Sequence, residues 1–180
     1  MSTTAATPAA HGVRPRQTAP ALNVSLLRGG TFSLAEQKPD AFTMIVFFRG
    51  LHCPVCHVQL TELNRRLDDV TKRGIELIAV SGETRERTEQ LAEEWKLDRL
   101  PLAYGLTEAQ MRDWGLFVSH GIKDTEPALF NEPGLFLIKP DGSVYYESVL
   151  SMPAGRPRLD DLLGGIDFFL ATDYPARGEA

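Results

Sequence analysis

The sequence predicts an α/β domain in which helices flank a central mixed β-sheet, with a β-hairpin at the N-terminal side. Residues 41–48 are apolar at nearly every position, as in a strand buried on both faces. Residues 75–80 form a second predicted strand, and apolar residues recur at helical spacing between the two. Strand, helix and strand of these lengths make a parallel βαβ unit.

The whole chain is consistent with one globular domain. Its 180 residues are enough for a sizeable core, and 43% hydrophobic with 24% charged residues is ordinary for a soluble protein. Residues 1–20 are rich in alanine, threonine and proline, so we expect a disordered arm there and a domain over residues 21–180.

Charge and hydropathy give no support for nucleic acid or a membrane as partner. A net charge of −5 gives no support for nucleic acid or an anionic membrane as partner. No apolar run approaches the ~20 residues needed to cross a bilayer. The N-terminus lacks the hydrophobic segment of a secretory signal, so we expect a cytoplasmic location.

The first half of the chain contains most of the predicted sheet. Residues 23–27 and 31–34, joined across two glycines, are predicted to form the N-terminal hairpin. The helix after the first buried strand should begin near Cys53. It should end at Gly74, because a glycine after basic residues is a common helix stop.

The middle of the chain alternates polar helices with short extended segments. Residues 84–95 predict a charged helix, residues 100–104 an edge strand because they contain a proline, and residues 107–114 a short helix opened by a capping box. The simplest interpretation of the acidic residues around the charged helix is a solvated face: Glu83, Glu86, Glu89, Glu93 and Glu94.

The last third completes the sheet. Residues 116–131 contain glycine and proline and predict an irregular surface segment over the site. Residues 133–138 predict a third apolar strand, which turns into an antiparallel partner at 143–149. Residues 159–170 carry one apolar stripe and predict a closing helix.

The cysteine pair is the main functional signal. Cys53 and Cys56 are the only cysteines, and Pro54 after the first fits the first turn of a helix. We therefore expect Cys53 at the helix N-terminus with its sulfur open to solvent, and Cys56 sheltered one turn below. Two cysteines at this spacing favour redox chemistry or metal binding over a structural disulfide framework.

The surroundings of Cys53 favour its thiolate. A free cysteine has a pKa of about 8.5, and a helix N-terminus or a CxxC motif lowers it to about 7 or below. Arg49, and His52 when protonated, would add positive charge. We interpret Cys53 as the nucleophile and Cys56 as the thiol that resolves whatever Cys53 has attacked.

Two other interpretations of the pair stay open. A zinc site would need two further ligands, and the chain has only four histidines, of which His52 and His57 adjoin the cysteines. The string Cys-x-x-Cys-His also matches a c-type haem attachment site, which the βαβ pattern opposes. We therefore expect no metal and no cofactor.

The arrangement resembles the thioredoxin fold. A βαβ unit with CxxC at the helix start, a later hairpin and a closing helix are its components. The segment from Glu132 to Phe136 resembles the part of thioredoxin where a cis-proline faces the CxxC pair. This resemblance implies that Pro133 lies beside Cys53, contacts the substrate and has a cis peptide bond.

A narrower resemblance is to the peroxiredoxin-like group of the alkyl hydroperoxide reductase/thiol-specific antioxidant (redoxin) family. It is carried by FFRGLHCPVC, LPLAYGL, EPGLFLIKPDG and YPARGE, and runs from about residue 20 to the C-terminus. It implies that Cys53 stands at the peroxidatic position. It also implies a peroxide or disulfide substrate, an external reductant such as thioredoxin or glutathione, and in some members a homodimer.

The sequence also departs from true peroxiredoxins. Gly50 stands where they have threonine or serine, Val46 where they have proline, and Tyr145 near where they have arginine. Arg156 resembles another conserved position with a more structural role. Since these polar groups polarise the O–O bond, their loss favours disulfide exchange over efficient peroxide reduction.

The sequence therefore predicts an enzyme, a thiol oxidoreductase with an antioxidant role that uses a Cys53/Cys56 dithiol–disulfide cycle on disulfides or peroxides. Two alternatives remain: a dedicated thiol peroxidase acting on hydroperoxides, and a non-enzymatic zinc-binding or interaction module on the same fold.

Overall fold

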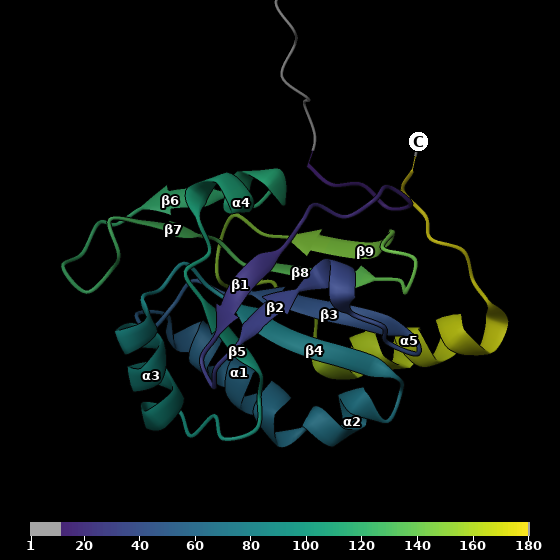
Figure 1. Cartoon of the computed structure of the whole chain (residues 1–180), viewed down its shortest axis with the longest axis horizontal. Coiled ribbons are helices and arrows are strands. Elements are labelled where there is room, and N and C mark those ends of the chain that lie inside the picture. Colours follow the sequence, from purple (N-terminus) through teal and green to yellow (C-terminus); the bar gives the residue numbers. More distant parts are fainter. Residues whose placement is uncertain (1–11, 180) are drawn as a thin grey trace, which may run out of the picture.

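The computed structural model describes residues 12–179 and places a seven-stranded mixed sheet at the centre of the molecule (Figure 1). The strand order is β2-β1-β5-β4-β3-β8-β9. The central strands β3 (Phe42–Phe47), β4 (Ile75–Val80) and β5 (Leu102–Tyr104) are parallel. β8 (Gly134–Ile138) pairs antiparallel with β3, and β1 (Asn23–Leu26) pairs antiparallel with β5. The predicted mixed α/β sheet is confirmed.

The hairpins at both ends of the sheet are also as predicted. β1 pairs with β2 (Thr31–Ser33), which is one edge, and β8 pairs with β9 (Val144–Val149), which is the other. One expectation is wrong: residues 102–104 are not at an edge, because the N-terminal hairpin extends the sheet beyond them.

The helices cover the two faces of the sheet unequally. One face carries α1 (Pro54–Arg65), α2 (Leu67–Thr71), α3 (Arg85–Glu94) and α5 (Leu159–Thr172), and the other carries α4 (Glu108–Asp113) (Figure 1). The alternation of side chains along β3 fixes this division. Met44 and Val46 belong to the core cluster beneath α1 and α5, whereas Ile45 and Phe47 belong to the opposite one.

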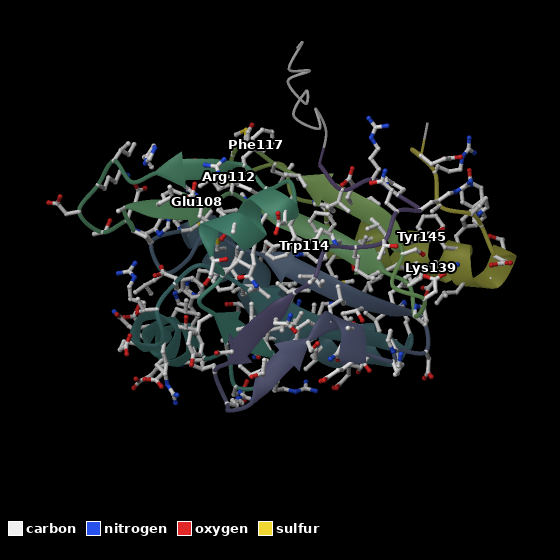
Figure 2. All side chains as sticks on the ribbon, turned by 45° about the horizontal axis from the view of Figure 1, so that its top comes forward. Glu108, Arg112, Trp114, Phe117, Lys139 and Tyr145 are labelled. Atoms are coloured by element: carbon white, nitrogen blue, oxygen red, sulfur yellow. The ribbon has the colours of Figure 1, made fainter. Side chains whose placement is uncertain are left out.

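Trp114, at the end of α4, fills the second core. It is fully buried, and its ring centroid lies 5.3 Å from that of Phe47 and 4.9 Å from that of Phe136. Glu108 and Arg112 of the same helix pair with each other on the outer surface (Figure 2). The capping box from Thr107 to Gln110 opens this helix as the sequence predicts.

Two predicted segments differ in detail. The helix after β3 is interrupted at Arg66, whose φ of −104° and ψ of 21° leave the helical region, so α1 and α2 replace one long helix. Residues 116–131 are not irregular throughout. They contain a short antiparallel hairpin of β6 (Val118–His120) and β7 (Leu129–Asn131), whose three-residue strands are too short to give an alternating pattern.

The expected N-terminal arm needs a correction over its second half. Residues 1–11 lie outside the described residues. In residues 12–20, Val13 is buried, the amide of Arg16 donates to the carbonyl of Val144, and Thr18 forms an isolated bridge with Ser143. This stretch therefore packs against β9. Backbone hydrogen bonds order it although its composition predicts disorder.

None of the helices formed by residues 12–179 has the length and apolarity needed to cross a bilayer.

Candidate active site

The β3–α1 junction places Cys53 at the N-cap of α1, one residue before Pro54 opens the helix. Cys53 has an extended backbone, with φ of −106° and ψ of 103°, and its Sγ accepts the amide N–H of Cys56 at 3.3 Å. The sulfur thus takes the place that a serine or aspartate oxygen takes in an ordinary N-cap. A thiolate there also faces the positive end of the helix dipole.

These contacts lower the pKa of the Cys53 thiol to about 6. The largest cause is a hydrogen bond from the Cys56 side chain; burial opposes it, and the backbone bond from Cys56 and the charges of Arg156 and Arg49 add to it. Cys53 is therefore mainly thiolate at neutral pH.

Cys56 has the opposite character. Burial raises the pKa of its thiol well above the usual value, and the hydrogen bond that it gives to Cys53 raises it further. The two thiols are not joined by a disulfide. One thiol is thus ionised at neutral pH while the other holds its proton.

The expected exposure of Cys53 is wrong. Both cysteines are fully buried and belong to the core cluster that contains Phe48 and Leu135. The helical stripe places Cys56 against the sheet, as predicted, but it says nothing about the segments from elsewhere that cover the helix N-terminus.

Arg156 reaches the sulfur of Cys56 from the segment before α5. Its Nη2 donates to Cys56 Sγ at 3.1 Å, and its Nη1 donates to Gln59 Oε1 at 3.0 Å. The guanidinium thereby favours the ionised form of both thiols. The resemblance implied a more structural role for this residue; the structure brings it into direct contact with the Cys56 thiol.

Arg49 lies on the Cys53 side of the site, as predicted. Its guanidinium lies 4.7 Å from the ring centroid of Phe130, and its Nε is 3.3 Å from Glu132 Oε2. Although the Glu132 carboxylate partly offsets the positive charge of Arg49, the charge of Arg49 still lowers the pKa of Cys53. The β6–β7 hairpin and the residue after it supply both partners.

His52 does not supply the positive charge that the sequence suggested. Its side chain is only 2% exposed, and its ring lies 4.7 Å from that of Phe130. Burial, and then the charge of Arg49, lower the pKa of the imidazole below 6.5, although Glu83, 4.0 Å away, opposes this. The ring is therefore neutral at neutral pH and does not act as a cation beside the sulfur.

Glu83 is part of this site rather than of a solvated helix face. Its side chain is 1% exposed and accepts the amide N–H of Leu51 at 2.9 Å and the Nε of Arg87 at 2.6 Å. It occupies the space beside Gly50, where a Cβ would lie 2.2 Å from Glu83 Oε1. The other predicted acidic positions are exposed: Glu86, Glu89, Glu93 and Glu94.

Pro133 is buried and lies near the thiol pair, but its peptide bond is not cis. Over residues 12–179 every peptide bond is trans. Pro133 lines a small gap with Gln59 and with Arg156, which is hydrogen-bonded to both Gln59 and the Cys56 sulfur. The Pro133 carbonyl accepts the amide N–H of Leu150 at 3.0 Å. The thioredoxin-like cis-proline implied by the resemblance is thus a wrong expectation.

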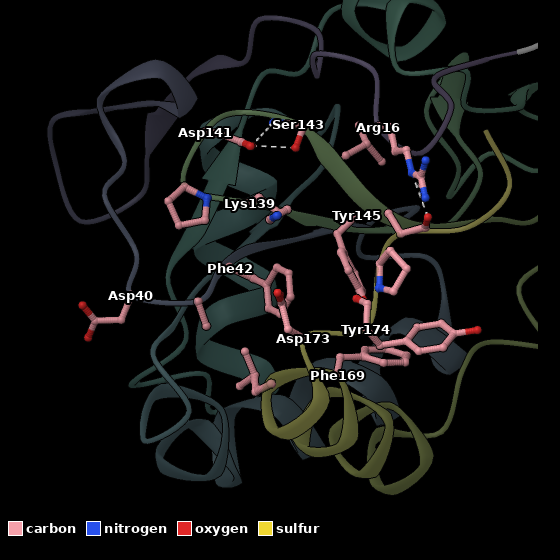
Figure 3. Close-up of a pocket in the computed structure, with 16 residues that line it drawn as sticks. Arg16, Asp40, Phe42, Lys139, Asp141, Ser143, Tyr145, Phe169, Asp173 and Tyr174 are labelled. Atoms are coloured by element: carbon pink, nitrogen blue, oxygen red, sulfur yellow. Dashed lines mark hydrogen bonds between the residues drawn. The ribbon is translucent and has the colours of Figure 1, made fainter.

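The described residues offer no gathered set of metal ligands: within 12–179, no three histidine, cysteine, aspartate or glutamate side chains come together as a metal ion needs. A cavity of about 610 Å³ lies between the sheet and the end of α5, where Phe42, Tyr145 and Phe169 line it (Figure 3). Because Phe42 begins β3 and Cys53 follows its other end, this cavity is separate from the thiols.

Comparison with known families identifies one match. The sequence pattern of the AhpC/TSA family matches residues 15–147, which include β1 to β8 and both cysteines. No curated protein sequence matches the chain.

Solved structures share the fold at low sequence identity. A mutant of peroxiredoxin 6 from Arenicola marina has a TM-score of 0.78 at 18% identity, over 90% of this chain and 76% of that one. Mycobacterium tuberculosis AhpC has a TM-score of 0.72 at 14% identity, over 90% and 95% of the two chains. A peroxiredoxin-like protein from Aquifex aeolicus has a TM-score of 0.70 at 16% identity, over 87% and 88%. The expected thioredoxin-like fold of peroxiredoxins is confirmed.

Proposed function

This chain belongs to the AhpC/TSA family of thiol-dependent oxidoreductases, and we propose that it works through a Cys53/Cys56 dithiol–disulfide cycle that reduces peroxides or disulfides. One observation carries the proposal. The Cys53 sulfur caps α1 with a pKa of about 6, and the Cys56 thiol stands one turn away with its proton retained. This difference in acidity supports Cys53 as the nucleophile and Cys56 as the resolving thiol.

The first half of the cycle oxidises Cys53. Its thiolate attacks an oxygen of a hydroperoxide, so that an S–O bond forms, the O–O bond breaks and the departing alkoxide takes a proton. With a disulfide substrate, the same thiolate attacks one sulfur and expels the other as a thiolate. Cys53 ends as a sulfenic acid or a mixed disulfide.

The second half of the cycle converts the oxidised Cys53 into a disulfide with Cys56. Cys56 attacks the Cys53 sulfur and expels water from the sulfenic acid or a thiol from the mixed disulfide. An external thiol reductant then supplies two electrons and reopens the bond. We propose thioredoxin or glutathione for this step and the cytoplasm as the location, because these reductants keep cytosolic thiols reduced.

The burial of the site favours a small oxidant. Both sulfurs are fully buried. Next to Cys53 in the chain, both ring nitrogens of His52 are buried without a hydrogen-bond partner among the described residues, whereas Arg49 Nε and Glu132 Oε2 form an ion pair with each other at 3.3 Å. The neutral His52 ring has one donor and one acceptor nitrogen, which suit a substrate that both donates and accepts hydrogen bonds, as a small hydroperoxide does. We propose that Pro133, which lines a gap with Gln59 and Arg156, contacts the substrate only through its shape, since it has no side-chain donor.

Turnover assays separate the two substrate classes. Full-length protein is incubated with hydrogen peroxide, an organic hydroperoxide or a small disulfide, with thioredoxin or glutathione as reductant. Cys53→Ser should abolish consumption of the true substrate, and Cys56→Ser should accumulate a sulfenic acid or mixed disulfide at Cys53. Equal modification of both cysteines in the converse variants would show that the assigned roles are wrong.

The alternatives give other results. A dedicated peroxidase turns over peroxide without any disulfide reductase activity. A zinc-binding module would carry stoichiometric zinc in native mass spectrometry and would protect both thiols from alkylation. A homodimer, which we also propose, would double the mass measured by sedimentation.

A further inference from the structure

The Arg156 guanidinium donates to the sulfur of Cys56, whereas it acts on Cys53 only through its charge. Nη2 of Arg156 donates to Cys56 Sγ at 3.1 Å, while Nη1 is held by Gln59 Oε1 at 3.0 Å. Gln59 lies one turn beyond Cys56 on α1, so the helix that carries the sulfur also aims the cation. The sulfur itself is fully buried.

A buried thiol is a poor resolving nucleophile unless something stabilises its anion. Only the thiolate attacks, and burial raises the pKa of Cys56. Among the groups around Cys56, the thiolate of Cys53 also raises this pKa, both by accepting the thiol hydrogen bond and by its charge, whereas Arg156 lowers it through charge and hydrogen bonding.

Oxidation of Cys53 moves this balance towards the Cys56 thiolate, although burial still raises the pKa of Cys56. When its sulfur becomes a neutral sulfenic acid or mixed disulfide, Cys56 loses the anion that kept its proton in place. Arg156 is unaffected by that reaction and remains 3.1 Å from the sulfur in this arrangement. Cys56 can then ionise against the guanidinium, and only after the first step is complete.

We propose that Arg156 is a catalytic residue of the resolving step, holding Cys56 as a thiolate once Cys53 has been oxidised. The proposal rests on the Cys53/Cys56 cycle proposed above. Cys56 thiolate attacks the Cys53 sulfur, the S–S bond forms and the bond from Cys53 to oxygen or to the foreign sulfur breaks. The leaving hydroxide or thiolate takes one proton, which balances the proton that Cys56 has lost.

The test loads Cys53 directly and so does not depend on the natural substrate. Reduced full-length protein receives one equivalent of methyl methanethiosulfonate, a small reagent that leaves Cys53 as a methyl disulfide and releases methanesulfinate. Attack by Cys56 then expels methanethiol and closes the intramolecular disulfide. Quenched-flow mass spectrometry follows both species, because the methylthio group adds mass and the internal disulfide does not.

Two variants and one control isolate the guanidinium. Arg156→Met should slow disulfide closure by about 10- to 100-fold, the range that one charge-assisted hydrogen bond controls. Arg156→Lys keeps the charge but loses the two-pronged guanidinium that bridges Gln59 and the sulfur. Its rate of disulfide closure should lie between those of the wild type and Arg156→Met. Arg158→Met removes a nearby arginine that provides no side-chain cap to α5, and it should close at the wild-type rate.

Other outcomes separate the two proposals. Closure at the wild-type rate in Arg156→Met, with its circular dichroism unchanged, would overturn the role of Arg156 even if the cycle operates. If Arg156→Met is unfolded, the rate for Arg156→Lys decides: a wild-type rate overturns the proposal and a slower one supports it. A wild-type protein that closes its disulfide but consumes no peroxide or disulfide would overturn the proposed function and leave the Arg156 comparison valid.

Discussion

Cys53 and Cys56 have the same side chain, yet their protonation differs because one caps a helix and the other is buried beneath it. The Cys53 sulfur accepts the Cys56 amide and the Cys56 thiol hydrogen, and so it is stabilised as an anion. Cys56 gives up that hydrogen bond when it ionises, and burial opposes its charge. The difference in acidity between the two thiols is therefore a property of their positions, not of the residue type.

A pH titration should show this asymmetry. Because the pKa of Cys53 is lowered to about 6, its thiolate should be present above that pH and lost below it. Thiolate ultraviolet absorbance in the full chain should follow one transition near pH 6. In Cys56→Ala the midpoint should rise, since the largest stabilising contact is removed. An unchanged midpoint in that variant would contradict the assigned cause.

The same shift links folding stability to pH. A thiol whose pKa is lower in the folded state contributes stability that is complete above its unfolded value of about 8.5 and is lost as the pH falls through about 6. Replacing Cys53 by serine should remove this dependence, so the difference in unfolding free energy between the two proteins should shrink from pH 9 to pH 5. Urea unfolding at each pH measures it.

At the scale of the element, the β3–α1 turn depends on a contact with the segment before α3. Gly50 has a φ of +133°, a conformation that disfavours residues with a Cβ, and its missing side chain leaves room for the Glu83 carboxylate. That carboxylate binds the amide of Leu51 and the guanidinium of Arg87. The turn that presents Cys53 is thus fixed by a residue about thirty positions further along the chain.

Gly50→Ala should therefore destabilise the protein by about 1–3 kcal/mol, through backbone strain and displacement of Glu83. The matched control is Gly29→Ala: Gly29 also has a positive φ, of +99°, but a Cβ there would meet no atom within 4 Å. The control carries the strain without the collision. Equal unfolding free energies for the two variants would show that the packing of Glu83 beside Gly50 contributes nothing.

At the scale of the whole molecule, segments remote in sequence complete the sheet and its second core. Residues 12–20 pair with the start of β9 and bury Val13 in the cluster that contains Trp114. The N-terminal hairpin converts β5 from an edge into an interior strand. Removing these contacts exposes apolar area and leaves backbone groups unpaired.

A chain that begins at residue 21 should accordingly unfold at lower urea concentration than one that begins at residue 12. The lost contacts include the buried side chain of Val13 and the backbone bonds between residues 16–19 and residues 142–144. We expect a loss of about 1–3 kcal/mol, the value for burial of one valine side chain with a few hydrogen bonds. Coincident unfolding midpoints would show that the domain begins at residue 21.

Most of the architecture followed from local pattern. Residues 41–48 and 133–138 are apolar enough to specify interior strands, and the capping box at Thr107 located the start of α4. The short strands at 118–120 and 129–131 could not be predicted, because three residues do not carry a periodicity. The interruption at Arg66 could not be predicted either, because the apolar stripe of the sequence continues past it without a break.

By itself, the sequence determined the mixed α/β sheet, the place of the two cysteines at a helix start and the packing of Cys56 against the sheet. It did so because periodicity and capping act between residues close along the chain. Only the tertiary structure decided that Cys53 is buried, that His52 is neutral, and that Arg156 and Glu83 complete the site. Burial and charge pairing depend on which distant segments meet, and no local pattern encodes that.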